Sequence, residues 1–199
     1  MEILFKSILT GYFVLFLSIA LLYRSYRVYK KTGINALTQI QEDGTLKILA
    51  LILKIHLLLV AGLIVDYVFG FDFLTANRFE WIPAFLSAGI GSLLLIICLA
   101  LIITAQTQMS SSWRLEVDSK NKSQLITHGL FKYSRNPILL ALRLGYFAMF
   151  LIIPCPYSFM TFLLGDICFQ LQVRKEEQYL QNIYSNEYHR YCSQVRRWF

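Results

Sequence analysis

The segment 82–103 contains no charged residue, and it limits the possible folds of this chain more than any other feature. A helix needs roughly 20 apolar residues to cross the hydrocarbon core of a bilayer, and this segment is long enough. Hydrophobic residues make up 56% of the whole chain, whereas soluble domains contain about 45–50%. The sequence therefore predicts an integral membrane protein.

Four other apolar segments lie along the chain, at residues 3–22, 46–69, 138–153 and 157–171. The last two are separated only by Pro154, Cys155 and Pro156, which is typical of a tight helical hairpin. Basic residues rather than a small-residue cleavage site follow segment 3–22, so we interpret it as a retained helix. We expect an all-α integral membrane protein with about five transmembrane helices, forming one multi-pass domain over residues 1–199.

Basic residues gather in three of the connecting segments. Loop 23–45 holds four Lys and Arg residues, loop 104–136 holds five and the tail 172–199 holds five. By the positive-inside rule these segments are cytoplasmic, so the N-terminus is outside and the C-terminus is inside. The net charge of +7 is then explained by topology, and it indicates no nucleic-acid partner. The four cysteines show no metal-ligand spacing, so we expect no metal site.

The stretch HGLFKYSRNPILLALRLGY, residues 128–146, contains a helix start. Asn136 is a favoured N-cap residue and Pro137 a favoured first helical residue. The free N–H groups of the first turn, together with Arg135, predict a site for a carboxylate or phosphate. The alternative is ordinary capping, with Arg135 reaching the lipid headgroups.

A polar stripe follows the last apolar segment. Residues 172–183 contain no Gly or Pro, so we expect the helix to continue past residue 171 into a cytoplasmic helical tail. Asp166, Gln170, Arg174 and Glu177 are spaced by four, four and three residues and therefore share one face. This face is either a polar seam that joins the hairpin or part of a binding site.

Two blocks at the end of the chain resemble a known family. They are SQLITHGLFKYSRNPILL and RKEEQYLQNIYSNEYHRYCSQVRRW. They are similar to the isoprenylcysteine carboxyl methyltransferase family, whose blocks usually read LVTxGxYxxxRHPxY and RxxxEExxLxxxFGxEYxxYxxxVxR, and which belongs with the membrane phospholipid methyltransferases. The resemblance covers roughly residues 116–197. It divides the chain into three N-terminal spans, 1–103, and a catalytic part, 104–199.

The resemblance implies a methyl donor, S-adenosylmethionine, held on the cytoplasmic side, with S-adenosylhomocysteine as its product. The acceptor would be a lipophilic small molecule or a lipidated group that enters from the membrane lipids. Carboxyl O-methylation of a prenylcysteine-type acceptor is the expected reaction, and N-methylation of a phospholipid or another amine is the alternative. Neither reaction requires a metal.

The resemblance also implies which residues contact the cofactor, and Arg135 joins them because of its charge at the helix start. The set is Glu116, Ser123, Gln124, Leu125, Ile126, Phe131, Arg135, Asn136, Pro137, Ile138, Leu139 and Glu176. The family has an arginine for the acceptor carboxylate where this chain has Gln172. We therefore expect Arg143 or Arg174, together with Gln172, to form the catalytic set around an acidic acceptor.

Two other classes of protein stay open. The chain departs from the family at Asn136 and Leu139, where histidine and tyrosine are usual, and this favours a non-catalytic relative that binds lipid or a partner. Glu176 and Glu177, with the pattern Tyr188, Tyr191 and Val195, favour an enzyme. Some membrane sterol reductases share the architecture of the C-terminal part, so a reductase is the third possibility.

Overall fold

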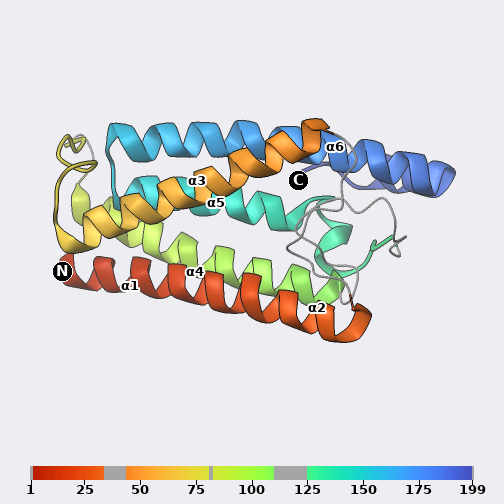
Figure 1. Ribbon diagram of the computed structural model, residues 1–199, viewed down its shortest axis with the longest axis horizontal. Helices are drawn as coiled ribbons and strands as arrows, with labels where there is room; N and C mark the ends of the chain where they lie inside the picture. The colour runs from red at the N-terminus through yellow and green to blue at the C-terminus, as the bar shows by residue number, and fades with distance from the viewer. Residues whose placement is uncertain (1, 34–43, 81–82, 110–124, 199) are drawn as a thin grey trace.

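The computed structural model describes residues 2–33, 44–80, 83–109 and 125–198, and within these ranges every regular element is helical (Figure 1). In chain order the elements are α1 (Glu2–Leu15), the π-helical segment η1 (Phe16–Tyr23), α2 (Arg24–Thr32), α3 (Gly44–Phe69), α4 (Ala84–Met109), the short 3₁₀ helix η3 (Gly129–Lys132), α5 (Pro137–Ile152) and α6 (Pro156–Gln194). The prediction of an all-α protein is confirmed for the described residues.

Three helices are long and apolar enough to cross a membrane: Glu2–Lys31, Lys47–Phe69 and Ala84–Met109. The first of these includes α1, η1 and most of α2, because the backbone stays helical through both junctions. α5 is apolar but has only 16 residues, and the first half of α6 is apolar as well. The chain is therefore a helical membrane protein.

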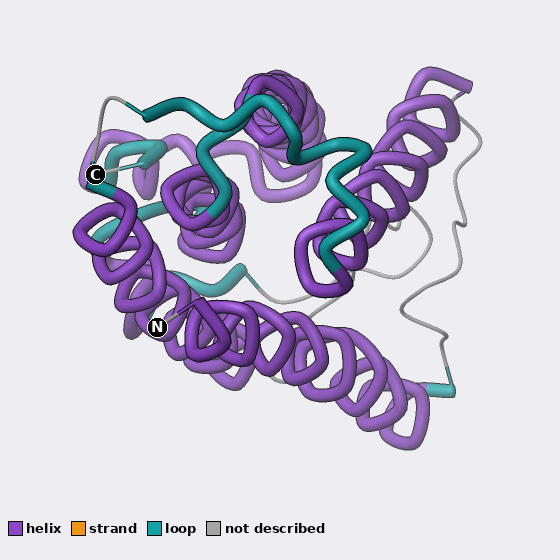
Figure 2. The backbone as a smooth tube through the Cα atoms, turned by 90° about the vertical axis from the view of Figure 1, so that its left-hand side faces the viewer, coloured by secondary structure: helices purple, strands orange, loops and turns teal. Residues whose placement is uncertain are grey.

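The helices run lengthwise and form one elongated bundle (Figures 1 and 2). In Figure 1 α5 lies between α6 and the helix formed by α1 and α2. The largest cluster of buried apolar side chains draws on α1, α3, α4 and α5. α5 is thus an inner helix, and its first turn lies inside the protein rather than at the lipid.

α4 and α5 approach each other closely because the contact face of α4 consists of small residues. This buried face includes Ser87, Ala88, Gly91 and Ser92. A Cβ atom added to Gly91 would lie 2.6 Å from the carbonyl oxygen of Ala148, so no larger residue fits there. Helices in membranes associate through such small-residue faces, which allow their backbones to pack together.

Polar side chains inside the first three spans connect neighbouring segments. The Asp66 carboxylate accepts hydrogen bonds from the backbone N–H groups of Phe73, Leu74 and Thr75, so it orders the loop after α3. Gln106 of α4 donates a hydrogen bond of 2.9 Å to the carbonyl oxygen of Ala20 in η1. These residues hold the spans in register.

The hairpin between α5 and α6 forms as the sequence predicts. Cys155 is the N-cap of α6, and it forms a capping box with Ser158. Along the hairpin, Arg143 of α5 pairs with Asp166 of α6, and the other Asp166 oxygen accepts from Gln170 Nε2 at 2.6 Å. The predicted polar stripe thus joins the hairpin at this level.

α6 is the longest helix, with 39 residues, and it extends past the bundle (Figure 1). The backbone departs from helical geometry at Ser185, where φ is 40°, and the chain then bends. Val195 ends the helix in an extended conformation. The residues after it fold back toward the start of α5, because the carbonyl oxygen of Arg196 accepts a hydrogen bond from Arg135 N–H at 3.1 Å.

Candidate active site

A cavity of about 250 Å³ lies inside the bundle, and it takes one face from each of the long helices. Its lining consists of Leu9, Tyr12, Phe13, Phe16, Leu21, Ala50, Leu53, Lys54, Leu57, Val60, Ile64, Leu95, Ile102, Gln106, Met109, Phe131, Arg135, Asn136, Pro137, Ile138, Leu139, Leu142, Gly145, Tyr146, Met149, Phe169, Gln172 and Glu176. The lining residues recur every three or four positions, as expected when one face of each helix turns toward a common space.

The cavity is long, and the polarity of its lining changes along its length. On α3 the lining runs from Ala50 to Ile64, which corresponds to roughly 21 Å of helix. The part near Ile64 and Leu9 is apolar, whereas the other part carries Arg135, Asn136 and Glu176. A ligand that fits this space has a polar head and an apolar body.

The start of α5 forms the polar end of the cavity. Asn136 is the N-cap residue and Pro137 the first helical residue, as predicted. The Asn136 side chain does not cap the helix, however, because its Nδ2 donates to the carbonyl oxygen of Arg197 at 3.3 Å. Among the described residues, no acceptor is found for the backbone N–H groups of Ile138 and Leu139, so both remain available to a ligand.

An ion-pair cluster lies beside this helix start. Glu177 of α6 lies 3.2 Å from Arg135 Nη2 and 2.6 Å from Arg197 Nη2, and Arg197 Nε also donates to it at 3.0 Å. Glu177 and Arg135 are both largely buried, with 13% and 14% of the side chain exposed. The Nε of Arg135 is buried and has no hydrogen-bond partner within the described part of the chain.

Glu176 contributes the acidic group of the cavity. It shares a face of α6 with Gln172 and Phe169, four and seven residues earlier, and all three line the cavity. In the described ranges it forms no ion pair, unlike its neighbour Glu177. Burial, and then the nearby Glu177 carboxylate, raise the pKa of Glu176 to about 7. A partly buried carboxyl group that lines a cavity and forms no ion pair in the described ranges can bind a cationic group of a ligand.

The η3 turn packs the C-terminal helix against the site. Gly129 has φ of +63°, and the space beside its Cα is filled by the side chain of Gln108, so no other residue type fits this position. Tyr191 donates a hydrogen bond of 2.6 Å to the carbonyl oxygen of Phe131. This contact orients the Phe131 ring, which forms part of the wall.

The structure brings together eight of the predicted site residues on this one cavity: Phe131, Arg135, Asn136, Pro137, Ile138, Leu139, Gln172 and Glu176. Leu125 and Ile126 do not line it, and Glu116, Ser123 and Gln124 lie outside the described residues. Arg143 does not line it either, because its guanidinium pairs with Asp166 and lies 4.3 Å from the ring centroid of Trp198. Arg174 is exposed. The roles predicted for these residues stay predictions.

Several residues of the site were not expected from the sequence. Tyr12, Lys54, Gln106 and Tyr146 line the cavity, and Arg197 pairs with Glu177 beside its polar end. Lys54 could be recognised from the sequence, because a lysine inside an apolar span has a high free-energy cost unless it faces protein or a cavity. The two tyrosines could not be recognised in this way, since an aromatic residue in a membrane span usually packs against neighbouring side chains.

A helical membrane bundle with a partly open internal cavity that is polar at one end is the class of protein that this geometry defines. The profile of the phospholipid methyltransferase family matches residues 86–187, which is just over half of the 199 residues. The chain therefore belongs to this family, within the group of membrane methyltransferases that includes the isoprenylcysteine carboxyl methyltransferases. No curated protein matches the chain.

The matched region begins in α4, includes the whole of α5 and ends in α6 beyond the bend. It therefore contains the α5 start, Gln172 and Glu176, and it leaves out α1 and α3. The family relationship supports a membrane methyltransferase. The wall supplied by α1 and α3 lies outside the matched range.

Proposed function

We propose that this protein transfers a methyl group from S-adenosylmethionine to a lipid-like acceptor, with both bound in the cavity described above. The observation that carries the proposal is the arrangement of one cavity: Arg135, the α5 start and Glu176 at one end, and an apolar wall along the rest. The family match supports the same reaction class.

The polar end fits the amino-acid part of the donor. The unpaired N–H groups of Ile138 and Leu139, with Arg135, suit a carboxylate. The Glu176 carboxylate suits the α-amino group, and the orphaned Nε of Arg135 is a donor that a bound anion would satisfy. The residues present therefore fit the cofactor that the family generally uses.

When bound, S-adenosylmethionine supplies an electrophilic methyl group, which passes to the acceptor in one displacement and leaves S-adenosylhomocysteine as a thioether. An acceptor carboxylate is already ionised at neutral pH and needs no general base. The task of the protein is then to hold two molecules in line, and such alignment supplies about 7–11 kcal/mol in favourable cases. The apolar walls exclude water from the reacting groups.

The apolar part of the cavity suits the body of the acceptor. Phe13, Val60, Ile64 and Met149 line it and offer only hydrocarbon and ring surfaces. A lipid tail that leaves the bilayer for this space keeps an apolar environment, while its reactive head lies toward the donor. We propose five spans, with the N-terminus outside and the polar end of the cavity on the cytoplasmic side, where the donor is dissolved.

Carboxyl O-methylation is the first candidate, and N-methylation of a phospholipid amine is the second. One observation favours the second, namely the description of the matching family, and an ammonium acceptor would have to lose its proton before it accepts the methyl group. Transfer of radiolabelled methyl groups to a prenylcysteine and to phosphatidylethanolamine, measured side by side, separates the two reactions.

Calorimetry tests the proposal directly. S-adenosylhomocysteine is titrated into the detergent-solubilised protein, and we expect saturable binding. Absence of binding at ligand concentrations near 1 mM, in protein that melts cooperatively, would overturn the enzyme proposal and leave a lipid-binding relative. A reductase is tested in the same way by titrating a reduced nicotinamide cofactor.

A further inference from the structure

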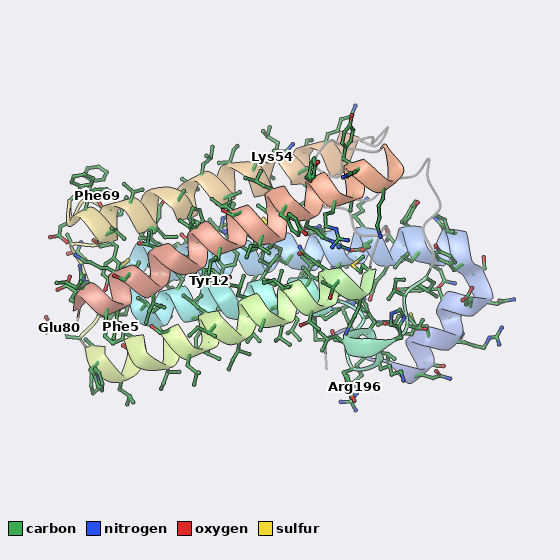
Figure 3. All side chains as sticks on the ribbon, turned by 90° about the horizontal axis from the view of Figure 1, so that it is seen from below. Phe5, Tyr12, Lys54, Phe69, Glu80 and Arg196 are labelled. Atoms are coloured by element: carbon green, nitrogen blue, oxygen red, sulfur yellow. The ribbon has the colours of Figure 1, made fainter. Side chains whose placement is uncertain are left out.

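Lys54 is a charged residue in the middle of an apolar helix, and the proposed function does not yet use it. It lies inside the membrane-spanning part of α3, Lys47–Phe69, about 10 Å deeper than Lys47 by helical rise. Figure 3 shows Lys54 between the two ends of the bundle, away from Phe69 and Glu80 at one end and Arg196 at the other. Such residues usually face a partner or a polar path.

Lys54 also lines the cavity, and its side chain is exposed as well, so it lies at an open edge of the cavity. Within the described residues it forms no ion pair and no hydrogen bond, whereas the other lining cation, Arg135, is paired with Glu177. The charges of the described lining are therefore Lys54, Arg135 and Glu176, and Lys54 alone is unpaired among the cations. An anionic ligand group would give this ammonium a partner.

The position of Lys54 along the bundle can be compared with α6. His56 of α3 lies beside Gly165 of α6, since a Cβ added to Gly165 would lie 3.0 Å from His56 Nε2. The two helices are antiparallel (Figure 1). Gln172 is therefore about 10 Å nearer the polar end than Gly165, and Lys54 about 3 Å nearer than His56.

The lysine stem extends the ammonium from this level toward the polar end. A Cα–Cβ bond in a helix tilts toward the helix N-terminus, and for α3 this is the direction of the polar end. The order along the cavity is therefore Glu176 and Arg135 first, then Gln172, then Lys54, and then the apolar wall.

We propose that Lys54 binds the anionic group of an amphiphilic acceptor and so fixes its head between the donor end and the apolar wall. The ligand class is a lipid-like molecule with a carboxylate or a phosphate. This inference rests on the proposed function for the location of the donor. It assigns a specificity-determining role to α3, which lies outside the region matched by the family profile.

The test measures binding of three probes without any donor present. An S-farnesylcysteine, its methyl ester and a short-chain phosphatidylethanolamine are titrated by equilibrium dialysis into protein in an uncharged maltoside detergent. We expect the wild-type protein to bind the farnesylcysteine carboxylate about tenfold or more tightly than the neutral ester, as charged hydrogen bonds allow. Lys54→Gln removes this difference, and Lys54→Arg retains it.

A matched control lies on the same helix. Lys47 is exposed, as Lys54 is, but it does not line the cavity, so Lys47→Gln leaves all three affinities unchanged. Loss of affinity for phosphatidylethanolamine in Lys54→Gln identifies phosphate as a second ligand of Lys54, whereas loss for the carboxylate alone identifies the carboxylate as its ligand. Unchanged affinity for both anions in Lys54→Gln, or an equal loss in Lys47→Gln, overturns the proposal and leaves Lys54 as a headgroup anchor.

Calorimetry with S-adenosylhomocysteine separates this inference from the proposed function. Lys54→Gln binds the donor product as the wild-type protein does, which also shows that the variant is folded. If the wild-type protein binds no donor product, the proposed function fails. The comparison of the carboxylate with its ester then still decides the role of Lys54.

Discussion

Two arginine–carboxylate pairs connect α5, or the turn before it, with α6, and they differ in what surrounds them. Arg143 and Asp166 form a pair inside the hairpin, which Trp198 covers. Arg135 and Glu177 form a pair at the polar end of the cavity, where Arg197 adds a second cation to the same carboxylate. The pairs are eight residues apart on α5 and its N-terminal turn, and eleven apart on α6.

The difference shows how one hairpin separates stability from binding. The Arg143 pair is complete, because Asp166 accepts from Arg143 on one oxygen and from Gln170 on the other. The cluster around Arg135 is incomplete, because within the described residues Arg135 Nε has no hydrogen-bond partner and the neighbouring Glu176 forms no ion pair. We therefore assign the first pair to holding the hairpin and the second cluster to holding a ligand.

The largest expected effect is a loss of donor affinity when Glu176, beside the Arg135–Glu177 cluster, loses its charge. Glu176→Gln keeps the size of the side chain and removes its charge, so we expect the affinity for S-adenosylhomocysteine to fall about a hundredfold. Calorimetry measures this. Glu187→Gln, an exposed site on the same helix, is the matched control and binds normally. Wild-type affinity in Glu176→Gln would show that the donor does not contact this carboxylate.

The second prediction concerns the complete pair. Arg143→Met leaves Asp166 without its cation in a partly buried position, so we expect a loss of about 2 kcal/mol in the free energy of unfolding. Thermal melting in detergent measures the loss, and affinity for the donor product stays unchanged. The double variant Arg143→Met, Asp166→Leu recovers much of the stability because no lone charge remains.

The same Arg143→Met variant tests the acceptor role predicted for Arg143. Binding of S-farnesylcysteine that weakens while the methyl ester binds as before would support a contact between Arg143 and an acidic acceptor. Equal binding of both probes in the variant and in the wild-type protein assigns Arg143 to the hairpin alone.

The third prediction uses pH. Burial and the nearby Glu177 carboxylate raise the pKa of Glu176 to about 7, and we propose that its ionised form binds the donor amino group, so we expect the affinity for S-adenosylhomocysteine to be highest above pH 7. It falls as the pH drops through 7, and we expect about a tenfold loss between pH 8 and pH 6. Glu176→Gln removes the dependence. A pH-independent affinity of the wild-type protein would contradict the assigned role.

The smallest expected effect concerns Trp198, whose ring lies over the Arg143–Asp166 pair. Trp198→Phe keeps a ring over Arg143 but weakens its attraction for the cation, so we expect a loss of about 0.5 kcal/mol in unfolding free energy. Measured in the Arg143→Met background, the same substitution changes stability by less, because the cation is absent. Equal effects in both backgrounds would mean that Trp198 acts only through packing.

The helices and one wall of the candidate site could be predicted from the sequence. Hydropathy identified the long apolar segments, and Asn136 with Pro137 identified the start of α5, because these features are local. Glu176 and Arg135 could be assigned to one site only through the resemblance of two motifs, since the residues are far apart in the chain.

The rest of the site depends on tertiary contacts that leave no local pattern. Arg197 reaches Glu177 only because the chain bends at Ser185. No residue type near Ser185 predicts that bend. Arg143 looks like a ligand-binding residue in the sequence, and its partner Asp166 becomes evident only when the hairpin closes. Lys54 lines the cavity because α3 packs against α6, which hydropathy does not determine.

The return of residues 195–198 onto the start of α5 also sets an order of assembly. The ribosome releases α1 to α5 before it has synthesised Arg196 and Arg197, so the carbonyl groups that bind Arg135 and Asn136 are the last parts of the site to be made. The bundle can insert into the bilayer first, and the polar end of the cavity forms after translation has passed residue 197. For expression, an affinity tag placed at the N-terminus leaves this late step undisturbed.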